Sequence, residues 1–174
     1  MVDLAVTAQA GEVYRIASVQ WTPTELLSEK QFEKISALTP GEKTSLKLAD
    51  DTRRAVDRVY TTQGYMDAKV NISAKPDAAT HTAAYTVAVQ PGERYTLHTM
   101  TLDGVTDAQR TEFMKTWKMQ PGMPYSTAYV ESFLTGNSAV LHTLDGYVMQ
   151  WRIAIHDDTR TVDLKMTVKR RGEK

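Results

Sequence analysis

The chain has 174 residues, and its 21 lysines and arginines balance 21 aspartates and glutamates, so the formal net charge is zero. This balance argues against a protein whose main task is to bind nucleic acid, because such proteins carry an excess of basic residues. A hydrophobic share of 41% predicts a folded core rather than a disordered chain. Because cysteine is absent, disulfides, cysteine metal sites and thiol nucleophiles are excluded.

The sequence repeats itself, with four landmarks that recur in the same order 79 to 82 positions later. This period is too long for the common solenoid repeats, so we expect each copy to be a small domain. We predict one domain over residues 11–90 and a second over residues 91–174. The landmarks are residues 11–16 with 92–97, Pro40-Gly41 with Pro121-Gly122, Gly64-Tyr65 with Gly146-Tyr147, and residues 86–89 with 165–168.

The first ten residues carry a trace of a third copy. Residues 2–7 (VDLAVT) resemble residues 162–167 (VDLKMT), and both segments are followed by Gly-Glu. We therefore predict that residues 1–10 are the last strand of a preceding repeat, in a piece of a longer array. The alternative is an extra edge strand of the first domain.

Each copy is predicted to open with a strand, over residues 14–21 and 95–102, in which apolar and polar residues alternate. The alternation slips by one position after Ile16 and after Leu97, which indicates a bulge or a bend. Capping boxes over residues 28–31 and 106–109 then mark the start of a short helix. In the first copy, residues 22–25 offer an earlier start. Both helices are expected to end before the Pro-Gly pairs.

A second helix is predicted up to Gly64 in the first copy and up to Gly146 in the second, since glycine suits the left-handed position that ends a helix. Two alternating strands follow, with a turn of polar residues between them. The order strand, helix, helix, strand, strand occurs twice and predicts an α+β fold, with two helices on one face of a three-stranded mixed sheet. The predicted closing strands are residues 66–73 and 82–89, then 147–155 and 162–168, with turns at residues 75–77 and 156–159.

This order, with these landmarks, resembles the POTRA domain of polypeptide-transport outer-membrane proteins. The family's opening pattern, Tyr-x-Ile-x-x-Ile-x-Phe, is matched by residues 14–21 and again by residues 95–102. The resemblance implies a periplasmic tandem array whose parent protein continues into a membrane β-barrel of the Bam/Tam type or of a two-partner secretion transporter. It also implies unfolded or partly folded β-barrel polypeptides as clients, with periplasmic accessory proteins as further partners.

In this family the strand after the second helix lies at a sheet edge, which here means residues 65–73 and 147–156. An edge strand leaves backbone N–H and C=O groups unpaired, and an extended client segment can pair with them whatever its side chains are. The resemblance thus implies two client-binding edges. The residues we assign to them are Met66, Asp67, Lys69, Val70, Asn71, Ser73, Met149, Gln150, Arg152, Ala154 and His156.

The sequence offers little support for an enzyme or for a cofactor. Its four histidines lack the spacing of metal ligands, and it contains no nucleophile elbow, phosphate loop or dinucleotide fingerprint. We predict no catalytic, cofactor-binding or metal-binding residues, and no nucleic-acid partner. The alternative function is a static scaffold that docks accessory proteins of the assembly machinery. Lys169, Arg170 and Arg171 are interpreted as a solvated terminus, with lipid contact as the alternative.

Overall fold

The structure is a computed structural model that describes residues 12–136 and 147–170 of the chain. The predicted remnant strand at residues 1–10, Gly146 and Arg171 lie outside the described residues. By packing, the chain forms two compact units, one of Met1–Val56 with Val70–Val89 and one of Asp57–Lys69 with Gln90–Lys174. None of the helices in the described ranges is long and apolar enough to cross a membrane.

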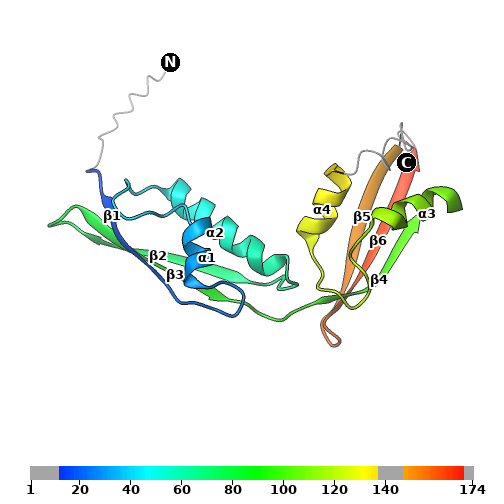
Figure 1. Cartoon of the computed structure of the whole chain (residues 1–174), viewed down its shortest axis with the longest axis horizontal. Coiled ribbons are helices and arrows are strands. Elements are labelled where there is room, and N and C mark those ends of the chain that lie inside the picture. Colours follow the sequence, from blue (N-terminus) through cyan, green and yellow to red (C-terminus); the bar gives the residue numbers. More distant parts are fainter. Residues whose placement is uncertain (1–11, 137–146, 171–174) are drawn as a thin grey trace, which may run out of the picture. The chain divides into compact units, whose positions relative to one another are not determined.

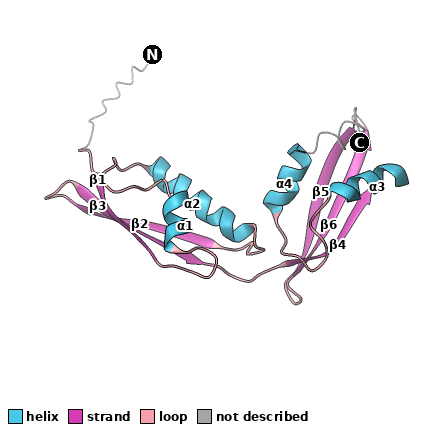
Figure 2. Ribbon diagram, in the orientation of Figure 1, coloured by secondary structure: helices cyan, strands magenta, loops and turns pink. Residues whose placement is uncertain are grey.

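The first repeat forms a three-stranded mixed sheet with helices on one face (Figures 1 and 2). Its strand order is β1-β3-β2, with β1 parallel to the central strand β3. The core between the layers includes Ile16, Phe32, Val56 and Val87. The elements are β1 (Arg15–Trp21), α1 (Glu29–Ile35), α2 (Leu46–Thr61), β2 (Lys69–Asp77) and β3 (Thr82–Gln90).

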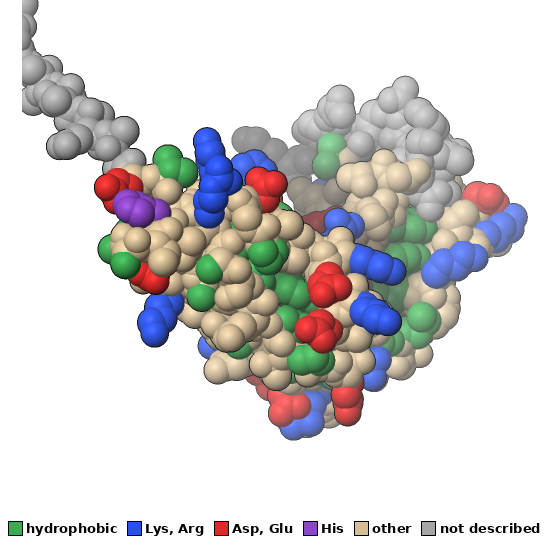
Figure 3. All heavy atoms as spheres, turned by 60° about the vertical axis from the view of Figure 1, so that its left-hand side comes forward, with side chains coloured by type: hydrophobic (Ala, Val, Ile, Leu, Met, Phe, Trp, Pro, Cys, Tyr) green, Lys and Arg blue, Asp and Glu red, His purple; other side chains and the backbone are tan. Residues whose placement is uncertain are grey.

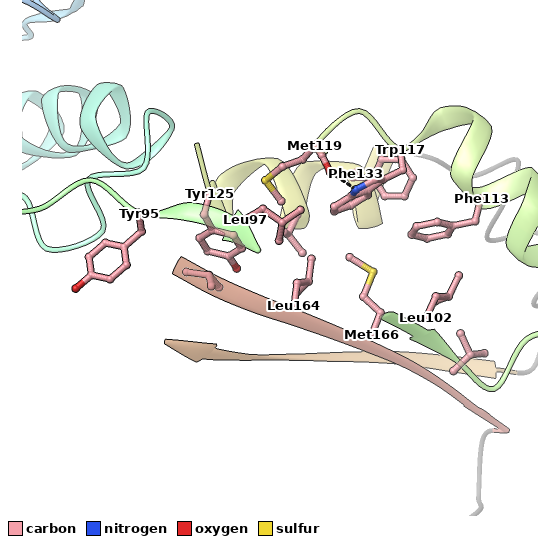
Figure 4. Packing of buried hydrophobic residues seen from close by; sticks show 13 residues of the cluster. Tyr95, Leu97, Leu102, Phe113, Trp117, Met119, Tyr125, Phe133, Leu164 and Met166 are labelled. Carbon is pink, nitrogen blue, oxygen red and sulfur yellow. Dashed lines mark hydrogen bonds between the residues drawn. The ribbon is translucent and has the colours of Figure 1, made fainter. Parts of the chain in front are cut away.

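The second repeat builds the same architecture, with strand order β4-β6-β5. The central strand β6 is parallel to β4 and antiparallel to β5. Its core is richer in aromatic rings: Phe113, Trp117 and Phe133 from the helices pack over Leu164 and Met166 of β6 (Figure 4). The elements are β4 (Thr96–Asp103), α3 (Asp107–Thr116), α4 (Thr127–Gly136), β5 (Tyr147–His156) and β6 (Thr161–Arg170).

The α+β fold and the predicted order of elements are confirmed, and so are several local signals. The register of β1 against β3 shifts between Ile16 and Ser18, and that of β4 against β6 shifts between Leu97 and Thr99, so the predicted irregularity is present in both copies. Ser28 caps α1, which excludes the earlier helix start at residues 22–25. Gly64 has a φ of +92° and follows α2, as predicted for a helix-ending glycine.

Three predicted boundaries need correction. The strand after α2 begins at Lys69 rather than at Met66, because residues 66–67 form a turn and the Ala68 N–H donates to the Tyr65 carbonyl. Residues 75–77 belong to β2 rather than to the connection, which is a turn at residues 78–81. Helix α4 ends at Gly136, and the remainder of the predicted helix, residues 137–146, lies outside the described residues.

Candidate functional site

Both strands that we predicted at sheet edges lie there. β3 and β6 are the central strands, and β2 and β5 each pair with a neighbour on one side only, among the strands that the structure describes. β5 pairs with β6 without interruption from Tyr147↔Arg170 to His156↔Thr161. The outer side of each edge strand therefore presents backbone groups that no described strand uses.

The opposite edges of the two sheets are partly covered. In the first repeat the Gly41 N–H donates to the Ile16 carbonyl (2.8 Å), and the Ile16 N–H donates to the Glu42 carbonyl (2.8 Å). The second repeat repeats this pattern between Leu97 and residues 122–123, at 2.7 and 2.8 Å. The Pro-Gly loops thus pair with the starts of β1 and β4, which leaves β2 and β5 as the edges free of such a loop within residues 12–136 and 147–170.

The β2 edge is shorter than the sequence predicts. Met66 and Asp67 precede the strand, in the turn after α2, so they are not part of the edge. Lys69, Asn71 and Ser73 are exposed, whereas Val70 is half-buried. Pro76 lacks an N–H group, which limits ladder pairing near the end of the strand and suits an edge position. The usable edge in the first repeat is therefore about residues 69–75.

The β5 edge is longer and more apolar. It has ten residues and contains neither proline nor glycine. Met149 is half-buried against the core, whereas Gln150, Arg152 and Ala154 are exposed. Val148 and Ile155 are 40% and 48% exposed, which is unusual for β-branched apolar residues on a sheet edge. A long apolar edge of this kind favours pairing with another extended chain.

The side chain of His156, the last predicted residue of β5, already has a partner. Its Nε2 lies 2.9 Å from Oδ2 of Asp163 on β6, and Nδ1 of His98 on β4 lies 3.0 Å from Oδ1 of the same carboxylate. A hydrogen bond from Thr99, followed by the one from His156, lowers the pKa of Asp163 from 3.8 to about 2. This group, which we call the Asp163 cluster (Asp163, His98, His156 and Thr99), links all three strands of the second sheet. It makes His156 a structural residue rather than a free client contact.

The arrangement suits binding by backbone pairing and offers little for chemistry. Within the described ranges, no group of three His, Cys, Asp or Glu side chains is placed to hold a metal ion. The tryptophans contribute to packing: Trp117 is buried, and Trp151 packs half-buried against the core of the second unit. On the face shown in Figure 3, acidic and basic side chains are interspersed.

Residues 14–92 match the family model for the POTRA domain, which is described as a surface antigen variable number repeat. A comparison with curated protein sequences found no match. Among solved structures, the chain is similar to POTRA3–5 of BamA from Haemophilus influenzae, with a TM-score of 0.65 and 13% identity over 95% of this chain and 69% of that one. It is also similar to BamA from Haemophilus ducreyi lacking POTRA domains 1–3, with a TM-score of 0.66 and 17% identity over 91% of this chain and 30% of that one.

Residues 14–92 are therefore a POTRA domain, and the chain as a whole has the fold of POTRA domains in tandem. POTRA domains are non-enzymatic scaffold domains, in agreement with the prediction that this chain is not an enzyme. Sequence reasoning identified the edge strands but missed the Asp163 cluster. A single polar residue between Val162 and Leu164 signals only an outward-facing position, and its partners come from two strands distant in the chain.

Proposed function

We propose that this chain is part of the periplasmic POTRA array of an outer-membrane protein that assembles or secretes other polypeptides. Its role there is to receive unfolded or partly folded β-rich clients by pairing their extended segments with its free strand edges. The family match and the shared fold support the periplasmic assembly or secretion role. The client, the membrane barrel of the parent protein and the accessory proteins follow from the family resemblance.

One observation carries the client-binding part of the proposal, and that is the outer edge of β5. It offers ten residues without proline, with Val148 and Ile155 exposed beside the unpaired backbone. Natural proteins usually protect such an edge with lysine, proline or a covering segment, because it otherwise recruits another strand. A protein that must accept many client sequences benefits from a surface that is read through backbone groups.

The proposal is tested by titrating the ¹⁵N-labelled chain with peptides that have the sequences of β-barrel strands. We expect the backbone amide signals of residues 147–156, and more weakly those of residues 69–75, to shift in a saturable manner. Shifts confined to the helices, or no shift at millimolar peptide, would refute pairing at the edges.

A pair of variants makes the test specific. Val148→Lys with Ile155→Lys places charges on the edge and is expected to weaken peptide binding, since lysine at an edge opposes strand addition. Met114→Lys is the control, because Met114 is a similarly exposed apolar residue (42%) on α3, away from the edge. Equal effects of the two changes would contradict the proposal.

The alternative, a static scaffold, predicts tight binding to one folded partner and indifference to unfolded clients. A pull-down with denatured barrel protein separates the two functions, because only the client-receiving array retains it.

A further inference from the structure

The two repeats differ at one position where their helices end in the same way. In the first, the Ser36 N–H donates to the Phe32 carbonyl at the end of α1 (2.9 Å). In the second, the Trp117 N–H donates to the Phe113 carbonyl at the end of α3 (3.1 Å). Ser36 therefore occupies the place that Trp117 holds in the second repeat.

In the second repeat, the indole of Trp117 fills this place. Trp117 is 2% exposed, and its Nε1–H donates to the Met119 carbonyl (Figure 4). Its ring packs edge-on against Tyr129 and Phe133, with centroids 5.1 and 5.0 Å away. The equivalent residues of the first repeat, 81 positions earlier, are the smaller Leu48 and Thr52.

In the first repeat the corresponding region contains a hollow of about 290 Å³, which we call the α1 hollow. Trp21 of β1 lies at its side, stacked on Phe32 with the ring centroids 4.7 Å apart. The Trp21 Nε1–H donates to the Leu27 carbonyl (3.2 Å), which holds the indole in place beside the hollow. The other lining residues that matter here are Val19, Ser36, Leu38, Glu29 and Glu33.

The lining indicates what the α1 hollow accepts. Its volume lies just below the range of drug-sized ligand pockets, which suits one large side chain. Its floor presents the rings of Trp21 and Phe32, and aromatic rings prefer to pack with other rings. Glu29 and Glu33 are exposed, and neither forms an ion pair with another described residue. These two carboxylates favour a basic residue next to the bound side chain.

We propose that the α1 hollow binds an aromatic side chain of an extended client segment, with a lysine or arginine beside it in the client sequence. The second repeat supports this choice, because the same place in the same fold holds an indole. The inference rests on the proposed function, in that it takes extended polypeptides as the ligands. It adds a selective side-chain contact to strand edges that read only the backbone.

The test uses the ¹⁵N-labelled 174-residue chain and a blocked hexapeptide that contains Trp-Lys. We expect a saturable shift of the Trp21 indole N–H signal and no shift of the buried Trp117 indole. Replacing the peptide's tryptophan by alanine should abolish the shift, and replacing its lysine by glutamate should weaken binding. A Trp21 signal that stays unchanged at millimolar peptide, or that responds equally to the alanine peptide, would overturn the proposal.

Charge reversal provides matched variants of the protein. Glu29→Lys with Glu33→Lys should weaken binding of the Trp-Lys peptide about tenfold, because two favourable charge contacts become repulsive. Glu25→Lys with Glu42→Lys changes the net charge equally at exposed residues that do not line the hollow. An equal loss of affinity in both pairs would show a general charge effect and contradict the site.

Ser36→Trp offers a second variant, because it fills the α1 hollow as the second repeat does. Provided that the variant keeps the wild-type circular dichroism spectrum, binding of the Trp-Lys peptide should be lost. Retained binding would contradict the proposal. The amide signals of β5 distinguish the two proposals: if barrel-strand peptides shift them while Trp21 never responds, the hollow fails and the edge proposal stands.

Discussion

The connection after β4 depends on Gly104, and replacing this residue tests how closely β4 and the central strand β6 fit together. Gly104 has a φ of +78°, and a Cβ atom there would overlap the carbonyl oxygen of Val168 and lie 3.1 Å from its carbonyl carbon. Val168 belongs to β6 and pairs with Met149 of β5, while the neighbouring Thr167 pairs with Asp103 of β4. The backbone at Val168 is therefore held from both sides and cannot yield easily.

Gly122 supplies the matched control. Its φ is +86°, but a Cβ atom there would meet no atom within 4 Å. In both alanine variants the left-handed conformation costs about 1 to 2 kcal/mol. Only Gly104→Ala adds the steric overlap, and forcing extra volume into a packed site costs about 1 to 3 kcal/mol. We therefore expect the free energy of unfolding to fall by about 2 kcal/mol more in Gly104→Ala than in Gly122→Ala.

The measurement is urea unfolding of the full chain, followed by the indole N–H signal of Trp117, which reports on the second unit. With a urea m-value of about 1 to 2 kcal/mol per molar, the midpoint of Gly104→Ala should lie about 1 M or more below that of Gly122→Ala. Coincident midpoints for the two variants would refute the steric argument.

Three further predictions concern the second unit. Trp117→Ala should lower the free energy of unfolding by about 3 to 5 kcal/mol, because it empties a buried aromatic site; the half-buried Trp151→Ala should cost less in the same urea experiment. Thr106→Ala removes the side chain that accepts the Gln109 N–H at 3.3 Å, so it should cost about 1 kcal/mol by thermal or urea unfolding, and an unchanged midpoint would show that the cap contributes nothing. The pKa of Asp163 is lowered to about 2 from 3.8, so its contribution to stability is complete above pH 4 and is lost as the pH falls from 4 to 2; Asp163→Asn should remove this pH dependence, which carboxyl-carbon NMR titration and acid unfolding both measure.

The two repeats share a fold and differ in what they add to it. The second repeat links its three strands through the Asp163 cluster, whereas the first repeat has Ala17 and Ala84 at the positions of His98 and Asp163. The first repeat has the α1 hollow, whereas the second fills that place with Trp117. Since the shared fold requires neither feature, we interpret both as specialisations of the individual repeats.

Local and periodic signals in the sequence were sufficient for the order of elements and for the sheet edges. The capping boxes at Ser28 and Thr106, the slip after Ile16 and the glycine at position 64 each depend on residues close together in the chain. Such signals act within a few residues, so they can be read without knowing the fold. The repeat added confidence in the order because each signal occurs in both copies.

The contacts between distant residues were decided by the tertiary structure alone. The start of β2 moved from Met66 to Lys69 because a turn after α2 takes up the intervening residues, although their alternation is that of a strand. Asp163 acquires its partners only when β4 and β5 flank β6, and the α1 hollow exists because the small side chain of Ser36 meets Trp21 across the fold. Pairing and packing depend on which surfaces meet, and a pattern along the chain does not contain that information.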